Sequence, residues 1–120
     1  MSWTSWQIFA GFLFCFKKGY KIMNTSVAIQ ILPMLEDDKK VVAVVDKAIE
    51  YIQSTGVTYA VGAFETTIEG DYDQLMEIVK NITKIAADAG APQVMTYVKI
   101  DYKSAGKVLG IHEKTDKYQH

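Results

Sequence analysis

The chain has 120 residues, of which 49% are hydrophobic and 22% are charged, and its formal net charge is −1. This length suits one domain with its own core, and the composition excludes disorder as the state of the whole chain. All thirteen basic residues are lysines, and residues 23–101 hold six of them against twelve acidic residues. An acidic region without arginine is poorly suited to phosphate, so we expect no nucleic-acid partner.

The first 22 residues are strongly apolar but do not match a known targeting segment. The run from Ile8 to Phe16 is too short to cross a bilayer, and the lysines follow it, whereas in a secretory signal they precede it. We expect residues 1–22 to be an extension upstream of a single domain at residues 23–120. A weak interfacial anchor is the alternative, and for the domain itself we expect no membrane contact.

Reactive side chains are few. Cys15 is the only cysteine, and the two histidines, His112 and His120, lie near the C-terminal end. The sequence has neither a CxxC nor an HExxH motif, so we expect no metal site, no cofactor and no Ser–His or Cys–His nucleophile in the core. A single cysteine gives no disulfide framework, which predicts a cytoplasmic location.

Hydrophobic periodicity predicts six elements in chain order. Alternating apolar residues predict four strands, at residues 25–32, 57–61, 64–69 and 93–101. Apolar residues spaced three and four apart predict one helix from Val41 to the stop at Gly56, preceded by a solvated acidic loop at residues 36–38. The second helix is predicted to begin at Asp71, which Gln74 follows three positions later, and to end at Gly90.

This order predicts an α+β fold of the ferredoxin-like βαββαβ type, with both helices on one face of a four-stranded antiparallel sheet. The expected sheet contribution to the core is Val27, Ile29, Ile31, Ile68, Val98 and Ile100. The other face is expected to be bare, and the domain is expected to end in a short C-terminal tail. Its central residues are small, and its edges carry Tyr97 and Lys99. Small residues allow close packing, so we expect a homo-oligomer, a dimer or tetramer, through this face.

Several stretches resemble the YkoF-like thiamine-binding proteins. They are Ser26-Val-Ala-Ile-Gln-Ile-Leu-Pro33, Tyr59-Ala-Val-Gly62, Thr66-Thr-Ile-Glu-Gly-Asp71 and Ile100-Asp-Tyr-Lys103. The resemblance extends from Asn24 to Tyr118. It implies a ferredoxin-like domain that assembles as dimers and tetramers and binds thiamine or its hydroxymethylpyrimidine moiety without known catalysis. Ala63 departs from the pattern, which has proline there, and should loosen the turn more than it alters the pocket.

Such a ligand needs a carboxylate or amide for its amino edge, an aromatic face for stacking, and acidity for the thiazolium charge. Glu65 or Glu69 would contact the amino group or the positive charge of the ligand. Gln30 and Thr67 would bind the remaining edges of the ligand, and Tyr97 would stack against it. Each also has a structural interpretation. The two glutamates suit a solvated strand face, Thr67 suits any strand, and Tyr97 suits packing.

Other functions on the same face remain as alternatives. A small enzyme using carboxylate acid/base chemistry is the first, because two glutamates lie on one strand face. RNA binding is not expected, because RNA-binding sheets of this type stack bases on central-strand aromatics, and Ala28, Gln30, Glu65 and Thr67 occupy those positions instead.

Overall fold

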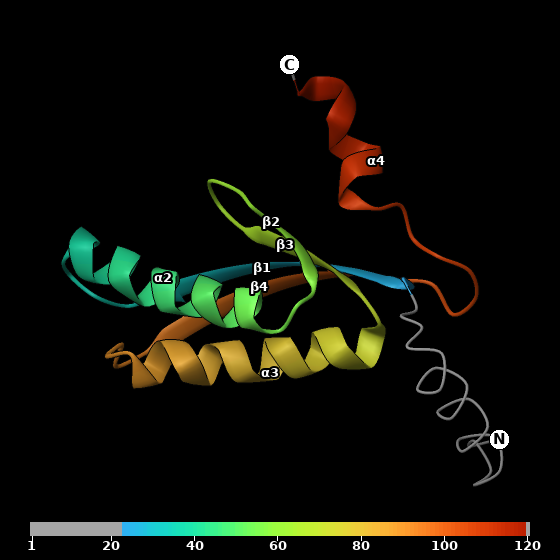
Figure 1. Ribbon diagram of the computed structural model, residues 1–120. Coiled ribbons are helices and arrows are strands. Elements are labelled where there is room, and N and C mark those ends of the chain that lie inside the picture. Colours follow the sequence, from blue (N-terminus) through green and yellow to red (C-terminus); the bar gives the residue numbers. More distant parts are fainter. Residues whose placement is uncertain (1–22, 120) are drawn as a thin grey trace, which may run out of the picture.

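The structure is a computed structural model that describes residues 23–119, so the expected extension at residues 1–22 lies outside the described residues. One antiparallel sheet has the strand order β2–β3–β1–β4. Its strands are β1 (Thr25–Pro33), β2 (Thr58–Val61), β3 (Thr66–Gly70) and β4 (Val94–Tyr102). Two 17-residue helices, α2 (Asp38–Ser54) and α3 (Tyr72–Asp88), lie together against one face of the sheet (Figure 1). The α+β prediction with its βαββαβ order is confirmed.

The register of the sheet determines which residues share a face. Val27 of β1 pairs with Ile68 of β3 and with Ile100 of β4, and Ala28 pairs with Thr67 and Lys99. Directly paired residues point to the same side of a sheet, and successive residues alternate. The side chains level with Val27 therefore face the helices. Those level with Ala28 lie on the opposite side, which we call the open face.

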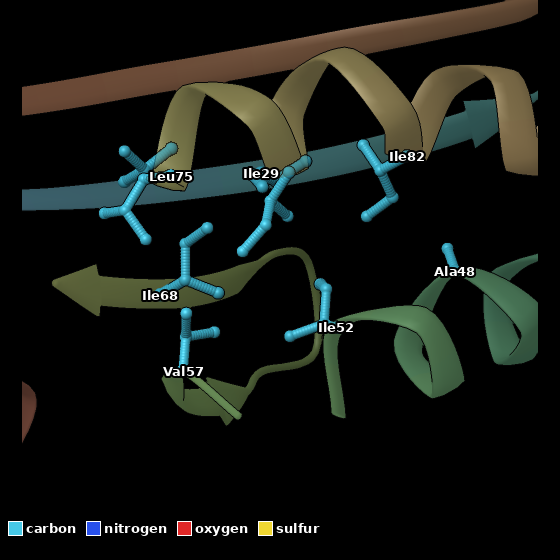
Figure 2. Close-up of a cluster of buried hydrophobic side chains, with 9 residues drawn as sticks. Ile29, Ala48, Ile52, Val57, Ile68, Leu75 and Ile82 are labelled. Atoms are coloured by element: carbon cyan, nitrogen blue, oxygen red, sulfur yellow. The ribbon is translucent and has the colours of Figure 1, made fainter. Parts of the chain in front are cut away.

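The core fills the space between the sheet and the two helices (Figure 2). Its largest fully buried side chains are Val27, Ile52, Ile68, Leu75, Ile78 and Ile82. Residues of α2 spaced four apart (44, 48 and 52) and residues of α3 at 75, 78, 82 and 86 are buried, which is the predicted helical spacing. Full burial of each such aliphatic side chain contributes about 1.5–3 kcal/mol relative to exposure.

One part of the predicted core is wrong. The side chain of Ile100 is 48% exposed, and Ile31 and Val98 are only half-buried, whereas Val27, Ile29 and Ile68 are buried as expected. Because β4 is an edge strand, Ile100 has a neighbouring strand on one side only. Alternation identified the face of each residue correctly, but it does not show how deeply a residue of an edge strand is buried.

The helix boundaries follow from capping side chains. Helix α2 begins at Asp38, three residues before the predicted start at Val41, because the Asp37 carboxylate accepts a hydrogen bond of 2.9 Å from the Lys39 backbone N–H. The acidic loop is therefore partly a helix start. The predicted beginning of α3 is confirmed, since Asp71 accepts a 3.2 Å bond from the backbone N–H of Gln74. The predicted stops at residues 56 and 90 are glycines with positive φ.

Candidate functional site

The open face is partly covered by the end of the chain. Residues 108–119, which we call the C-terminal segment, include α4 (Ile111–Thr115) and the short helix η1 (Asp116–Tyr118). Helix α4 lies on the side of the sheet opposite α2 and α3 (Figure 1). Ile111 is buried, and its backbone N–H donates a 2.7 Å hydrogen bond to the Glu69 carboxylate. The prediction of a bare face is therefore wrong around Glu69, because the C-terminal segment packs there and its Ile111 N–H uses the Glu69 carboxylate as an acceptor.

A cavity of about 690 Å³ lies between the open face and the C-terminal segment. Four residues paired side by side across the sheet, Ala60, Thr67, Ala28 and Lys99, run along its floor. Two of these four side chains end at Cβ, so the middle of the sheet is hollow where larger side chains would fill it. Ser26 also lines the cavity, and Lys114, Thr115 and Gln119 come from the C-terminal segment.

The charged groups of the cavity are balanced. The Glu65 carboxylate lies 3.1 Å from the Lys99 ammonium, and Asp101 and Lys114 add one charge of each sign to the lining. The side chains of Glu65 and Lys99 are 38% and 74% exposed. An exposed ion pair of this kind contributes about 0–1 kcal/mol. A ligand cation or amino group can therefore replace Lys99 beside Glu65 at little cost.

The end of the cavity farthest from Glu69 is a tight turn between β2 and β3. The Gly62 N–H donates a 2.9 Å hydrogen bond to the Glu65 carbonyl, and a Cβ on Gly62 would lie 2.8 Å from the same oxygen. The turn therefore requires glycine at position 62. Ala63 lies within this turn, and the looser turn expected from it stays a prediction. Phe64 follows, with its side chain 82% exposed beside the cavity.

The structure separates the five candidate residues into three groups. Glu65 and Thr67 both line the cavity. Glu69 is only 5% exposed and accepts the hydrogen bond from the C-terminal segment. Gln30 and Tyr97 pair with each other across β1 and β4, two residues along from Ala28, a distance of about 7 Å. Gln30 lines a smaller cavity of about 230 Å³ on the other side of the turn, and Tyr97 is 50% exposed.

Sequence reasoning missed the contribution of the C-terminal segment and of Ala60. Ala60 follows Thr58 by two residues on β2, so the two side chains share a face. The period-two pattern therefore contains the information that places Ala60 on the open face. The segment gave no such signal, because α4 has only five residues, too few for a helical period to appear.

Two further properties bear on what this site can do. In residues 23–119 no cluster of three or more histidine, cysteine or acidic side chains is arranged to hold a metal ion. Over the same residues, no helix combines the length and the apolar character needed to cross a membrane. The chemistry available in the cavity is therefore that of carboxylate, ammonium and hydroxyl groups above a small apolar floor.

Comparison with known proteins gives consistent matches. Residues 27–119 match the family model described as thiamine-binding protein. A UPF0045 protein of Clostridium perfringens is 50% identical over 94 residues, which cover 78% of this chain and 96% of that protein. A Bacillus cereus structure described as a domain of unknown function, DUF77, has 41% identity and a TM-score of 0.70, and the match covers 81% of this chain and 91% of the other. A candidate thiamine biosynthesis or salvage protein of Thermotoga maritima has 35% identity and a TM-score of 0.70, with 80% and 99% of the two chains covered.

Proposed function

The chain belongs to the thiamine-binding protein family, and on that premise we propose that it binds thiamine or its hydroxymethylpyrimidine moiety in the cavity on the open face. The observation that carries this proposal is the hollow row of Ala28 and Ala60 with the Glu65 carboxylate at its side. A cavity of about 690 Å³ lies within the range of small-molecule sites, roughly 300–1,000 Å³.

The proposed contacts follow from the chemistry of the ligand. A flat aminopyrimidine ring fits over Ala28 and Ala60, whose side chains end at Cβ on either side of Thr67. The Glu65 carboxylate accepts from the exocyclic amino group or faces the thiazolium charge, and it releases Lys99 in doing so. The Thr67 hydroxyl serves a ring nitrogen. Gln30 and Tyr97 lie side by side next to the cavity floor. Tyr97 stacks against the part of the ligand that extends beyond the floor.

We propose binding rather than catalysis because the two glutamates do not form a pair. Glu65 lies just before β3 and Glu69 lies within it, four positions apart in the chain. At strand spacing this is roughly 13 Å, which is too far for two carboxylates to act on one small group. Glu65 is paired with Lys99, and Glu69 accepts from the backbone of α4. This arrangement therefore favours binding over acid/base chemistry that would need both carboxylates together.

The binding role is tested by Glu65→Gln, which keeps the size of the side chain and removes its charge. Calorimetric titration with thiamine, hydroxymethylpyrimidine and an unrelated pyrimidine should show heat with the first two only. Glu65→Gln should weaken thiamine binding about tenfold or more, because hydrogen bonds to charged groups are the stronger ones. Glu50→Gln is the matched control, since Glu50 also pairs with a lysine, Lys47, but lies on α2.

Unchanged thiamine affinity in Glu65→Gln would reject this residue as the charged contact. The absence of heat with any of the three compounds in the unmodified chain would reject the proposed ligand class altogether.

We propose that a second copy of the chain closes the outer side of the cavity. Phe64, which lines the cavity, is 82% exposed, and Leu109 and Tyr118 of the C-terminal segment are 60% and 70% exposed. Large apolar side chains exposed in this way favour an interaction surface. Sedimentation should therefore give at least a dimer, and Phe64→Ser should shift the distribution towards monomer. A monomer at every concentration for the unmodified chain would contradict self-association.

A further inference from the structure

We infer that Glu69 is a positioning residue, which holds the C-terminal segment in place as one wall of the ligand cavity. This inference rests on the proposed function for the identity of the ligand. Ile111 lines the cavity, whereas Glu69, which holds it, is not among the lining residues. Glu69 would then act on the ligand through Ile111 and α4 rather than by touching it.

The burial of Glu69 is the first step. Its side chain projects from β3 onto the open face, level with Ser26, and only 5% of it is exposed. A carboxylate removed from water needs a donor. The Ile111 N–H supplies one at 2.7 Å, which is the short distance of a charge-assisted hydrogen bond.

The fit around this hydrogen bond is close. A Cβ added to Gly110 would lie 3.4 Å from a Glu69 carboxylate oxygen and 3.4 Å from Glu113. The Gly110 N–H donates to the Glu113 carboxylate at 2.8 Å, so the backbone at residues 110 and 111 faces one carboxylate of the sheet and one of α4 itself. A side chain at position 110 would therefore be in van der Waals contact with both carboxylates, so the segment lies closely against the sheet.

The wall depends on this contact. Val108 and Ile111 are the buried apolar residues of the segment, and the Thr115 hydroxyl donates back to the Ile111 carbonyl at 3.0 Å, within α4. Lys114 and Thr115, which line the cavity, belong to the same short helix as Ile111, so their position depends on where Glu69 holds Ile111. Releasing Ile111 would move both away from the floor formed by Ala28 and Ala60.

Four forms of the protein test the inference. Two are variants of the full chain, Glu69→Ala and Glu69→Gln. The others are a chain ending at Leu109, which keeps the buried Val108, and Glu69→Ala in that shortened chain. In the absence of ligand, Glu69→Ala should speed hydrogen exchange of the Ile111 amide about tenfold or more, with no change in the amides of β1. Glu69→Gln retains an amide oxygen that accepts from Ile111 but lacks the charge, so it should lose less protection than Glu69→Ala. Glu65→Ala, the control in the cavity, should leave this exchange unchanged.

Thiamine titration gives the second measurement. Glu69→Ala and the chain ending at Leu109 should lose thiamine affinity to a similar degree, and Glu69→Gln should lose less. Glu69→Ala within the shortened chain should cause no further loss. Two results would mean that the ligand touches Glu69, and would overturn the inference. One is a further loss of affinity when Glu69→Ala is made in the shortened chain. The other is a loss of affinity in Glu69→Gln as large as that in Glu69→Ala. Unchanged exchange at Ile111 in Glu69→Ala would also overturn it. If the unmodified chain binds no thiamine, the proposed function fails, while the exchange result still decides whether Glu69 holds the segment.

Discussion

Replacing Ala28 with phenylalanine is expected to weaken thiamine binding at least about a hundredfold, which corresponds to about 2.7 kcal/mol. Ala28 lies in the middle of the cavity floor, with Thr67 and Lys99 paired on either side of it. A benzyl group on this residue would occupy the space above the two alanines that we propose for the pyrimidine ring. The measurement is calorimetric titration with thiamine and with hydroxymethylpyrimidine.

The fold should survive this change, because Ala28 points away from the core and phenylalanine suits a strand. The matched control is Ala43→Phe. Ala43 lies on α2 and lines a different hollow of about 520 Å³, between α2 and the end of α3. Ala43→Phe should therefore leave thiamine affinity unchanged. Equal losses in both variants would show that the effect is a general one, and full affinity in Ala28→Phe would place the ligand elsewhere.

Truncating Ile68 to alanine is expected to lower the free energy of unfolding by about 2–5 kcal/mol, the usual cost of emptying a fully buried aliphatic site. Ile68 has 0% exposure and packs between Val27, Ile52 and Leu75 in the centre of the core (Figure 2). Urea unfolding followed by circular dichroism measures the loss. Because a destabilisation of this size is a large part of the stability of a small domain, the variant should be studied at low temperature.

Ile100→Ala makes the same chemical change on the other side of Val27. Ile100 is 48% exposed on the edge strand, so its truncation should cost less than about 1.5 kcal/mol, including the lower strand preference of alanine. Equal costs at positions 68 and 100 would contradict the structure, and would instead fit the original prediction that both residues belong to the core.

The fold was predictable because its signals are local and agree with one another. The apolar spacing of α3, the cap at Asp71 and the glycine at position 90 each point to the same helix, and all three are confirmed. The strand order was predictable from general rules of connection, given the order of the elements. What periodicity did not contain is how deeply each residue of the edge strand β4 is buried, and Ile100 is 48% exposed. Similarly, the three-residue error at the start of α2 arose because Asp37 caps the helix before any apolar residue appears.

The site was predictable only in part. Strand alternation placed Glu65, Thr67 and Glu69 on one face, and the structure agrees. It did not distinguish an accessible glutamate from a buried one, because that difference depends on Ile111, 42 positions later in the chain. A long-range contact made by a backbone N–H leaves no mark in the local sequence pattern. The role of the C-terminal segment as a cavity wall is therefore information that the folded structure alone provides.

The central claim is that the cavity between the open face and the C-terminal segment holds the ligand. It is tested most directly by nuclear magnetic resonance of the labelled chain during titration with thiamine. We predict that the signals that shift are those of Ala28, Ala60, Thr67 and Thr115, while the signal of Ala43 stays in place. Shifts gathered around Ala43 instead, or none at Ala28 and Ala60 once thiamine is bound, would contradict the account.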